Sequence, residues 1–284
     1  MEYFLQIGVQ TLMIASLYAI IALGYNLLYS MNRFFDMTYA GYMVIGAYGY
    51  FGVQTLQLGL IGTTLLTLVL TASFAYVCER LLFERLRERK STPVVLMVAS
   101  LGLLTVIQGI IALIFTSNIQ VLRSTDVVLH IGAVVLTDIH VATIVCAIAL
   151  YGIAWYVLKH TKFGVRFRAV SDNEELAKAS GIEVLKIRRI GVIVASIIGA
   201  IAGILYGMDT SIEPLMGLGL LFKGIIAAII GGLGSITFGI AGAILLATSE
   251  NVAVWFISGE WKDAVAFLIL ILVLLIRPQG ILQK

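Results

Sequence analysis

Long uncharged stretches alternate with short charged ones along this 284-residue chain. The uncharged stretches have 30, 42, 32, 20, 19 and 26 residues: Tyr3–Asn32, Met37–Cys78, Ser91–Leu122, Ile139–Leu158, Ile190–Met208 and Gly224–Ser249. A helix needs about 20 mainly apolar residues to cross the hydrocarbon core of a bilayer. The pattern therefore predicts an all-α, polytopic bundle of transmembrane helices, which forms a single domain over residues 1–284.

Two hydrophobic stretches are too long for one helix. A 42-residue helix would be about 63 Å long, twice the thickness of the hydrocarbon core, so Met37–Cys78 is expected to form two spans that turn near Gln54–Gly62. The hydrophobic stretch from Gly224 to Phe256 is interrupted by Gly231-Gly232-Leu233-Gly234-Ser235. This interruption predicts a broken or re-entrant helix, and we expect eight or nine spans in total.

The composition narrows the class of protein. Hydrophobic residues make up 60% of the chain and charged residues 12%, with a mean hydropathy of +1.03. An average soluble domain is about half apolar and a quarter charged. The composition excludes a soluble enzyme, a nucleic-acid-binding protein and a disulfide-stabilised extracellular domain, and it makes membrane lipid the expected surroundings.

The basic residues predict the orientation. Of 19 Lys and Arg residues, 16 lie in Glu79–Lys90, in Lys159–Arg189 or next to other helix ends on the same side. Loops rich in Lys and Arg stay in the cytoplasm. We therefore expect a multi-pass protein of a bacterial or archaeal plasma (inner) membrane, with its N-terminus outside and its C-terminus cytoplasmic.

The remaining polar residues predict little chemistry. The Val-rich segment 117–138 is expected to contain a small external hairpin, with Ile131-Gly132-Ala133 near its turn. The histidines His130, His140 and His160 have no metal-ligand spacing, so no metal site is predicted. There is no Walker A sequence and no paired nucleophile and base, and the chain is expected to be non-catalytic.

Small residues recur at helical spacing in one predicted span. Gly191, Ala195, Gly199, Gly203 and Gly207 lie four residues apart. Such a ridge lets helix backbones approach closely, so we interpret it as a packing seam.

The cytoplasmic segment 159–189 is the most informative. Ser171-Asp172-Asn173 before Glu174-Glu175 has the pattern of a helix N-cap, and Ser171 with Glu174 has capping-box spacing. Gly181 is suited to end this helix at its C′ position. The pattern predicts a short polar helix between two spans, which either lies on the lipid surface or docks a cytoplasmic partner.

Three regions resemble the permeases of branched-chain amino-acid ABC transporters. Gly164, Arg168-Ala169, Asp172-Asn173, Ala177 and Gly181-Ile182 are similar to the cytoplasmic coupling segment of that family. Lys223-Gly224 with Gly231-Gly232-Leu233-Gly234-Ser235 resembles its Lys-Gly…Gly-Gly-x-Gly-Ser block, and Arg277-Pro278-Gln279-Gly280 resembles its C-terminal tail. The three matches occur in the expected order over most of the chain.

One region departs from that family. Where the family usually has an Asn-Phe-Ala-His-Gly-Glu-type sequence, this chain has Asp36-Met37-Thr38-Tyr39-Ala40-Gly41. The departure puts the substrate in doubt, although an amino acid remains the first expectation. A charged residue inside a membrane is costly and usually functional, so Asp36 and Glu250 are candidates for the translocation path. Asp36 beside Arg33 is alternatively a local ion pair, and Glu250 alternatively stabilises a helix interface.

The resemblance implies the coupling residues, whereas the path candidates follow from polar residues and glycines at membrane depth. The residues expected to couple the chain to an ATPase are Gly164, Arg168, Ala169, Asp172, Asn173, Glu174, Glu175, Ala177 and Gly181. The path candidates are Asp36, Thr38, Tyr39, Gly41, Gly231, Gly232, Gly234, Ser235 and Glu250, of which the glycine-rich break qualifies because such backbone at membrane depth lines a cavity or is buried in protein.

The resemblance also implies partners. An importer of this type has two ATP-binding subunits, which hold the ATP and Mg, so no cofactor is expected in this chain. A second similar permease, or a second copy of this chain, completes the path, and an extracytoplasmic binding protein delivers the substrate. The alternative from the composition alone is a secondary transporter or channel that needs no ATPase; it would be expected to show several ionisable groups for ion coupling within the membrane.

Overall fold

The computed structural model describes residues 2–122, 128–131, 134–234, 238–256 and 258–276. Six helical segments are long and apolar enough to cross a membrane. They comprise α1 (Glu2–Asn32), the continuous helix of α3 (Gly59–Cys78), π-helical η1 (Glu79–Phe83) and α4 (Glu84–Glu88), then α5 (Pro93–Phe115), α6 (Asp138–His160), α9 (Val184–Asp209) and α11 (Gly239–Phe256). The predicted all-α membrane bundle is confirmed.

Three shorter hydrophobic helices complete the bundle. They are α2 (Thr38–Gln54), α10 (Met216–Gly231) and α12 (Lys262–Ile276), with 17, 16 and 15 residues. Added to the six longer segments, they account for the expected eight or nine spans, and that number is approximate because 15 residues rise only about 23 Å. The division of Met37–Cys78 into two helices is confirmed, with the turn at Gln57 and Gly59, both of which have positive φ angles.

Helix α9 lies at the centre of the bundle and packs against α1, α2 and α3. Its small residues permit this contact. A Cβ atom on Gly203 would lie 2.7 Å from the carbonyl carbon of Met43 in α2, and one on Gly46 would lie 2.5 Å from Cα of Ala200 in α9. Real Cβ atoms are essentially never so close to backbone, so the predicted packing seam along α9 is confirmed.

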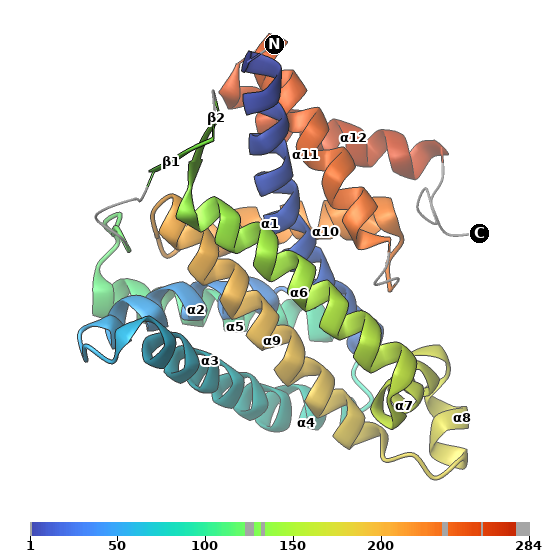
Figure 1. Ribbon diagram of the computed structural model, residues 1–284. Coiled ribbons are helices and arrows are strands. Elements are labelled where there is room, and N and C mark those ends of the chain that lie inside the picture. Colours follow the sequence, from blue (N-terminus) through green and yellow to red (C-terminus); the bar gives the residue numbers. More distant parts are fainter. Residues whose placement is uncertain (1, 123–127, 132–133, 235–237, 257, 277–284) are drawn as a thin grey trace.

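The charged segments gather at one end of the bundle (Figure 1). The α1–α2 connection, η1, α4 and the start of α9 meet there with two short helices, α7 (Lys162–Asp172) and α8 (Glu174–Ala179). We call this the arginine-rich end, because Arg33, Arg87, Arg188 and Arg189 all make contacts in it.

The opposite end holds the α2–α3 turn, a two-stranded antiparallel sheet and the short helix η2 (Gly259–Trp261). In the sheet, β1 (Val128–Ile131) pairs with β2 (Val134–Thr137), with Val128 opposite Thr137 and Ile131 opposite Val134. These strands lie in the segment where a hairpin was predicted, and residues 132–133 of the predicted turn lie outside the described residues.

The predicted helix break is confirmed. Helix α10 ends at Gly231, and Gly232 and Gly234 follow with φ angles of 109° and 83° that favour glycine. A Cβ atom on Gly231 would lie 2.5 Å from the carbonyl carbon of Phe238, so the chain turns back tightly before α11. The backbone N–H of Gly234 donates to Oδ1 of Asn26 at 3.0 Å, which holds the break against α1. Ser235 lies outside the described residues.

Candidate functional site

The predicted coupling segment begins with helix α7, which lies tightly against the end of α6. Its N-cap is Thr161, whose hydroxyl accepts from the N–H of Gly164 at 3.1 Å. A Cβ atom on Gly164 would lie 2.5 Å from Cα of Leu158. Only glycine therefore fits where the two helices meet, and the buried side chains of Phe167 and Val170 hold α7 against the bundle.

Helix α8 has the ends that its sequence predicts, with one correction. Asn173 is the N-cap, and its Oδ1 accepts from the N–H groups of Glu175 and Leu176, both at 3.0 Å. The predicted capping role of Ser171 is wrong, because Ser171 lies in the last turn of α7. The amphipathic pattern of α7 continues to Asp172, which leaves Asn173 as the residue between the two helices.

The C-terminal end of α8 is a Schellman motif. The N–H of Ile182 donates to the carbonyl of Ala177 and that of Gly181 to the carbonyl of Lys178, both at 3.0 Å. Gly181 has a φ angle of 77°, as its predicted place after the helix requires. Capped at both ends, this six-residue helix has a defined shape although it is too short to be stable alone.

Glu174 fixes α8 to the bundle through its ion pair with Arg188 of α9. Its carboxylate binds Lys178 Nζ at 2.8 Å and Arg188 Nη2 at 2.7 Å. Burial acts to raise the pKa of Glu174, but Lys178 and Arg188 together outweigh it and hold the pKa below its usual range. Arg188 is itself buried, and its Nε donates to the carbonyl oxygen of Met31 at 3.2 Å. Glu174 is thereby connected to both α9 and α1.

The other predicted coupling residues divide between two surfaces. Ala177 is buried and Ala169 half-buried against the bundle. Exposed residues of the segment are Arg168, Asp172, Asn173, Glu175 and Gly181. Leu176, which was not among the predicted residues, is 65% exposed on α8 beside Glu175.

A second network at the arginine-rich end joins helices far apart in sequence. Arg189 forms an ion pair with Glu84 through both Nε and Nη2. Arg87 pairs with the buried Glu79, and its Nη2 donates to Oδ1 of Asn32 at 2.8 Å. These contacts were not predicted, since the sequence shows only that both signs of charge occur in Glu79–Lys90.

Asp36 lies in this network. It is buried, and its carboxylate accepts from Asn32 Nδ2 and from the backbone N–H of Thr38, both at 3.0 Å. Asp36 therefore satisfies the first N–H group of α2 from the position before the N-cap residue Met37. The alternative of a local pair with Arg33 is not what the structure has, because Arg33 donates to the carbonyl oxygen of Ser171 in α7 instead.

The neighbouring path candidates are buried among helices of this chain. Thr38 and Tyr39 are fully buried, and the Tyr39 hydroxyl donates to the carbonyl of Ile21 at 3.2 Å. A Cβ atom on Gly41 would lie 2.6 Å from Cδ1 of Ile107 in α5. The structure brings Asp36, Thr38, Tyr39 and Gly41 together at the packing of α1, α2, α5 and α9.

Glu250 belongs to a different cluster. It is buried in α11, forms an ion pair with Lys223 of α10 and accepts from the Tyr18 hydroxyl of α1 at 2.8 Å. Lys223 also pairs with Asp263 of α12 at 2.7 Å. The cluster joins four helices, and the buried carboxylate of Glu250 has a polar partner on α10 and another on α1. The glycine-rich break lies apart from it, beside Asn26.

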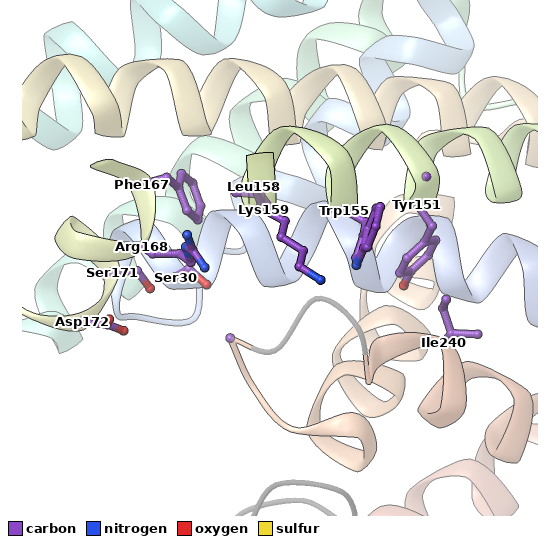
Figure 2. A pocket seen from close by; sticks show the side chains of 12 residues that line it. Ser30, Tyr151, Trp155, Leu158, Lys159, Phe167, Arg168, Ser171, Asp172 and Ile240 are labelled. Atoms are coloured by element: carbon purple, nitrogen blue, oxygen red, sulfur yellow. The ribbon is translucent and has the colours of Figure 1, made fainter. Parts of the chain in front are cut away.

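A cavity of about 660 Å³ opens next to the break and the coupling segment. Figure 2 shows Tyr151, Trp155 and Lys159 of α6 on one side, with Arg168 and Ser171 of α7 at one end and Ile240 of α11 opposite. Among the described residues, no group of three or more His, Cys, Asp or Glu side chains is placed to hold a metal ion.

Known proteins resemble this chain over nearly its whole length. The family model described as branched-chain amino acid transport system / permease component matches residues 7–274. The high-affinity branched-chain amino acid transport system permease protein LivH of Escherichia coli (strain K12) is 27% identical, with 99% of this chain and 96% of the relative covered. The corresponding protein BraD of Pseudomonas aeruginosa is 26% identical with the same coverage.

A solved structure has the same fold. PsaBC from Streptococcus pneumoniae, in complex with a Fab, matches with a TM-score of 0.51 at 14% identity, covering 95% of this chain and 91% of that chain. This likeness supports the helical arrangement alone. Taken with the family match, it leaves one conclusion: the chain belongs to the branched-chain amino acid permease family, whose members are membrane-spanning subunits of ABC importers.

Proposed function

We propose that this chain forms half of the translocation path of an ATP-driven importer for an amino acid, and that α8 is the element through which ATPase subunits move it. Two cytoplasmic ATP-binding subunits would hold the ATP and Mg, and an extracytoplasmic binding protein would deliver the substrate. A second permease, either another chain or a copy of this one, would complete the path. The family match supports these partners as a class.

The observation that carries the coupling proposal is the way in which α8 is held. The helix is capped at both ends by Asn173 and by the Schellman motif at Gly181. Its inner side is fixed through Glu174 and Ala177, while Glu175 and Leu176 face outward. A helix that is rigid, exposed and anchored to two spans transmits a push from a docked partner into the membrane domain.

The same contacts define a route for that motion. A displacement of α8 acts on Arg188 through Glu174, and Arg188 bonds the carbonyl of Met31 at the end of α1. Helix α9 carries Arg188 and lies at the centre of the bundle, so it is the element whose tilt would change most of the packing. ATP binding in the partners would in this way switch the spans between outward-open and inward-open states.

The path residues are proposed from the break and from the depth of the charged groups. Gly231, Gly232 and Gly234 interrupt the chain between α10 and α11, and backbone of this kind at membrane depth lines a cavity or is buried in protein. We place the arginine-rich end in the cytoplasm, with the N-terminus outside, because Lys and Arg are retained on that side. Asp36 and Glu250 remain candidates for contacts with the solute or with the second permease.

The decisive experiment changes the exposed apolar residue of α8. Leu176→Asp is expected to leave membrane insertion intact and to abolish stimulation of the assembled importer's ATPase by leucine-loaded binding protein. Val165→Asp is the matched control, because Val165 is 57% exposed on α7 and Leu176 is 65% exposed on α8. Normal stimulation in the Leu176→Asp variant would contradict the coupling role. Transport by the purified chain in liposomes, driven by an ion gradient without ATP, would favour a secondary transporter.

A further inference from the structure

The cavity between α6 and α11 has the lining of a lipid site. Its volume is about 660 Å³, and its walls come from α1, α6, α7, Gly234 of the glycine-rich break and the start of α11. Lys159 and Arg168 are its two basic residues and Asp172 is its acidic one. The lining therefore has an excess of positive charge, at the end of the bundle where the helices leave the membrane.

The two basic side chains are available to a ligand. Within the part of the chain that the structure describes, neither Lys159 nor Arg168 makes an ion pair, whereas Arg33, Arg87, Arg188 and Arg189 are all engaged. Lys159 instead lies over the ring of Trp155, with Nζ 4.9 Å from the ring centroid. Figure 2 shows Lys159 and Arg168 directed into the same opening from α6 and α7.

The rest of the cavity is apolar and continuous with the lipid-facing surface. Trp155 is 52% exposed, and Gly152 and Ile240 are also exposed along the sides of the opening. Next to them on α6, Ile153 and Tyr156 are 61% and 60% exposed. Tryptophan near the end of a span marks the boundary between hydrocarbon and headgroups. An acyl chain can therefore enter along Gly152 and Trp155 while the headgroup stays at Lys159.

We propose that this cavity binds an anionic phospholipid, with its phosphate between Lys159 and Arg168 and one acyl chain against Trp155 and Ile240. Basic pockets between helices at a membrane boundary recognise anionic headgroups in this way. The site needs only that the arginine-rich end lies at a membrane–water boundary, so it does not depend on the proposed transport function. Because Arg168 belongs to α7, the lipid would tie the coupling segment to the bilayer.

The ligand chemistry favours lipid over a soluble anion. A free phosphate would be bound by the two cations alone and would leave the apolar walls of Trp155 and Ile240 in contact with water. A phospholipid would place its phosphate between the two cations and its acyl chain against the apolar walls. Each Lys or Arg near an anionic membrane surface contributes about fivefold to affinity, so removal of both charges is expected to weaken binding about 25-fold.

Trp155 reports on the site directly. In the full-length W255F/W261F protein, Trp155 is the single tryptophan, because the chain has three. This protein is reconstituted in nanodiscs that contain brominated phosphatidylglycerol or brominated phosphatidylcholine at equal mole fraction. For each variant, the fluorescence of Trp155 is compared with that in the corresponding unbrominated lipid. The anionic lipid is expected to quench Trp155 more strongly than the zwitterionic one, and K159Q/R168Q is expected to remove this difference.

The matched control removes the same charge outside the cavity. K162Q/R166Q changes two exposed basic residues of α7 that do not line the site, and it is expected to keep the preference for phosphatidylglycerol. Equal quenching by both lipids in the parent protein would overturn the proposal, as would an equal loss in the control variant. Reversal of the quenching by inorganic phosphate would show a soluble-anion site instead. Native mass spectrometry of the purified complex gives an independent test. Phosphatidylglycerol retained by the parent complex but not by its K159Q/R168Q form would support the lipid site.

Discussion

Arg188 and Glu174 join the exposed helix α8 to the centre of the bundle. The two side chains meet at 2.7 Å, and the same guanidinium donates from Nε to the carbonyl of Met31. Arg188 is buried, whereas the side chain of Glu174 is 39% exposed. One arginine therefore holds three elements, α1, α8 and α9, in a fixed relation.

The first prediction concerns this arginine. Arg188→Lys keeps the charge but cannot reproduce both contacts, because a single ammonium group replaces a forked guanidinium. We expect it to lower the thermal stability of the purified protein modestly and to reduce ATPase stimulation in the assembled importer severalfold. Arg188→Met should cost more, about 1–3 kcal/mol, since the carbonyl of Met31 loses its donor and Glu174 loses one of its two cationic partners.

A matched pair of variants separates coupling from stability. Lys178→Met removes the other partner of Glu174, a lysine whose side chain is 59% exposed, and leaves Arg188 in place. An exposed i,i+4 pair contributes about 0.3–0.5 kcal/mol. If Lys178→Met reduced ATPase stimulation as much as Arg188→Lys does, the assignment of Arg188 as the connecting residue would be wrong.

The second prediction is a pH dependence at α8. The pKa of Glu174 in the folded protein is held below its usual value of about 4.5, so its ion pairs contribute fully above that pH and are lost as the pH falls through the lower folded value. Hydrogen exchange at the N–H groups of residues 177–182, measured while the pH is lowered from neutral to below 4.5, should show opening only at the acid end. Glu174→Gln should remove this acid-induced step.

Much of α8 could be predicted because its ends are local. Asn173 caps two N–H groups within three residues, and Gly181 closes a motif that spans six residues, so both are visible in the sequence. The hydrophobic runs predicted the helices for the same reason, since each run is about the length of a membrane span. Ser171 was wrongly predicted as an N-cap because α7 ends and α8 begins close to it. Both Ser171 and Asn173 are residue types that cap helices, so the sequence pattern fitted either one.

The partners of buried charges could not be predicted. A carboxylate buried at membrane depth needs a polar partner, but the contact of Glu250 with Tyr18 joins residues 232 positions apart. Arg188 binds the carbonyl of Met31, and Arg33 that of Ser171, so each partner is a backbone group with no sequence signal. The local capping of Thr38 by Asp36 was detectable from their spacing, although the cost of a buried carboxylate had suggested the path instead.

The third prediction tests the close packing of α9 against α2. Gly203→Ala places a Cβ atom 2.7 Å from the carbonyl carbon of Met43, where the neighbour is backbone and cannot rotate away. We expect a loss of about 1–3 kcal/mol in stability. Gly109→Ala in α5 is the control, since a Cβ there meets nothing within 4 Å, and it should be neutral or slightly stabilising. Equal melting temperatures for the two variants in detergent would contradict the packing.

The fourth prediction concerns the buried pair of Lys223 and Glu250. Lys223→Met leaves the Glu250 carboxylate without its cation, and removal of one partner of a buried pair costs about 3–5 kcal/mol. The double variant K223M/E250Q should be more stable than K223M alone, because no charge then remains buried. Asp263→Asn is expected to change stability little, since that side chain is 76% exposed.

The fifth prediction separates two roles of Asp36. Its Oδ1 accepts from the N–H of Thr38 and its Oδ2 from Asn32. Asp36→Asn keeps an oxygen that can cap α2, whereas Asp36→Ala removes the cap at a cost of about 1 kcal/mol. If Asp36 is only a cap, Asp36→Asn should transport leucine normally in the assembled importer and Asp36→Ala should melt at a lower temperature. If the charge serves the translocation path, Asp36→Asn should lose transport, and its melting temperature should lie between those of the parent protein and Asp36→Ala, because its Nδ2 cannot accept from Asn32. Both variants lack the charge, but only Asp36→Ala also lacks the oxygen that accepts from Thr38. Measuring transport and melting temperature on both variants therefore decides between the two roles.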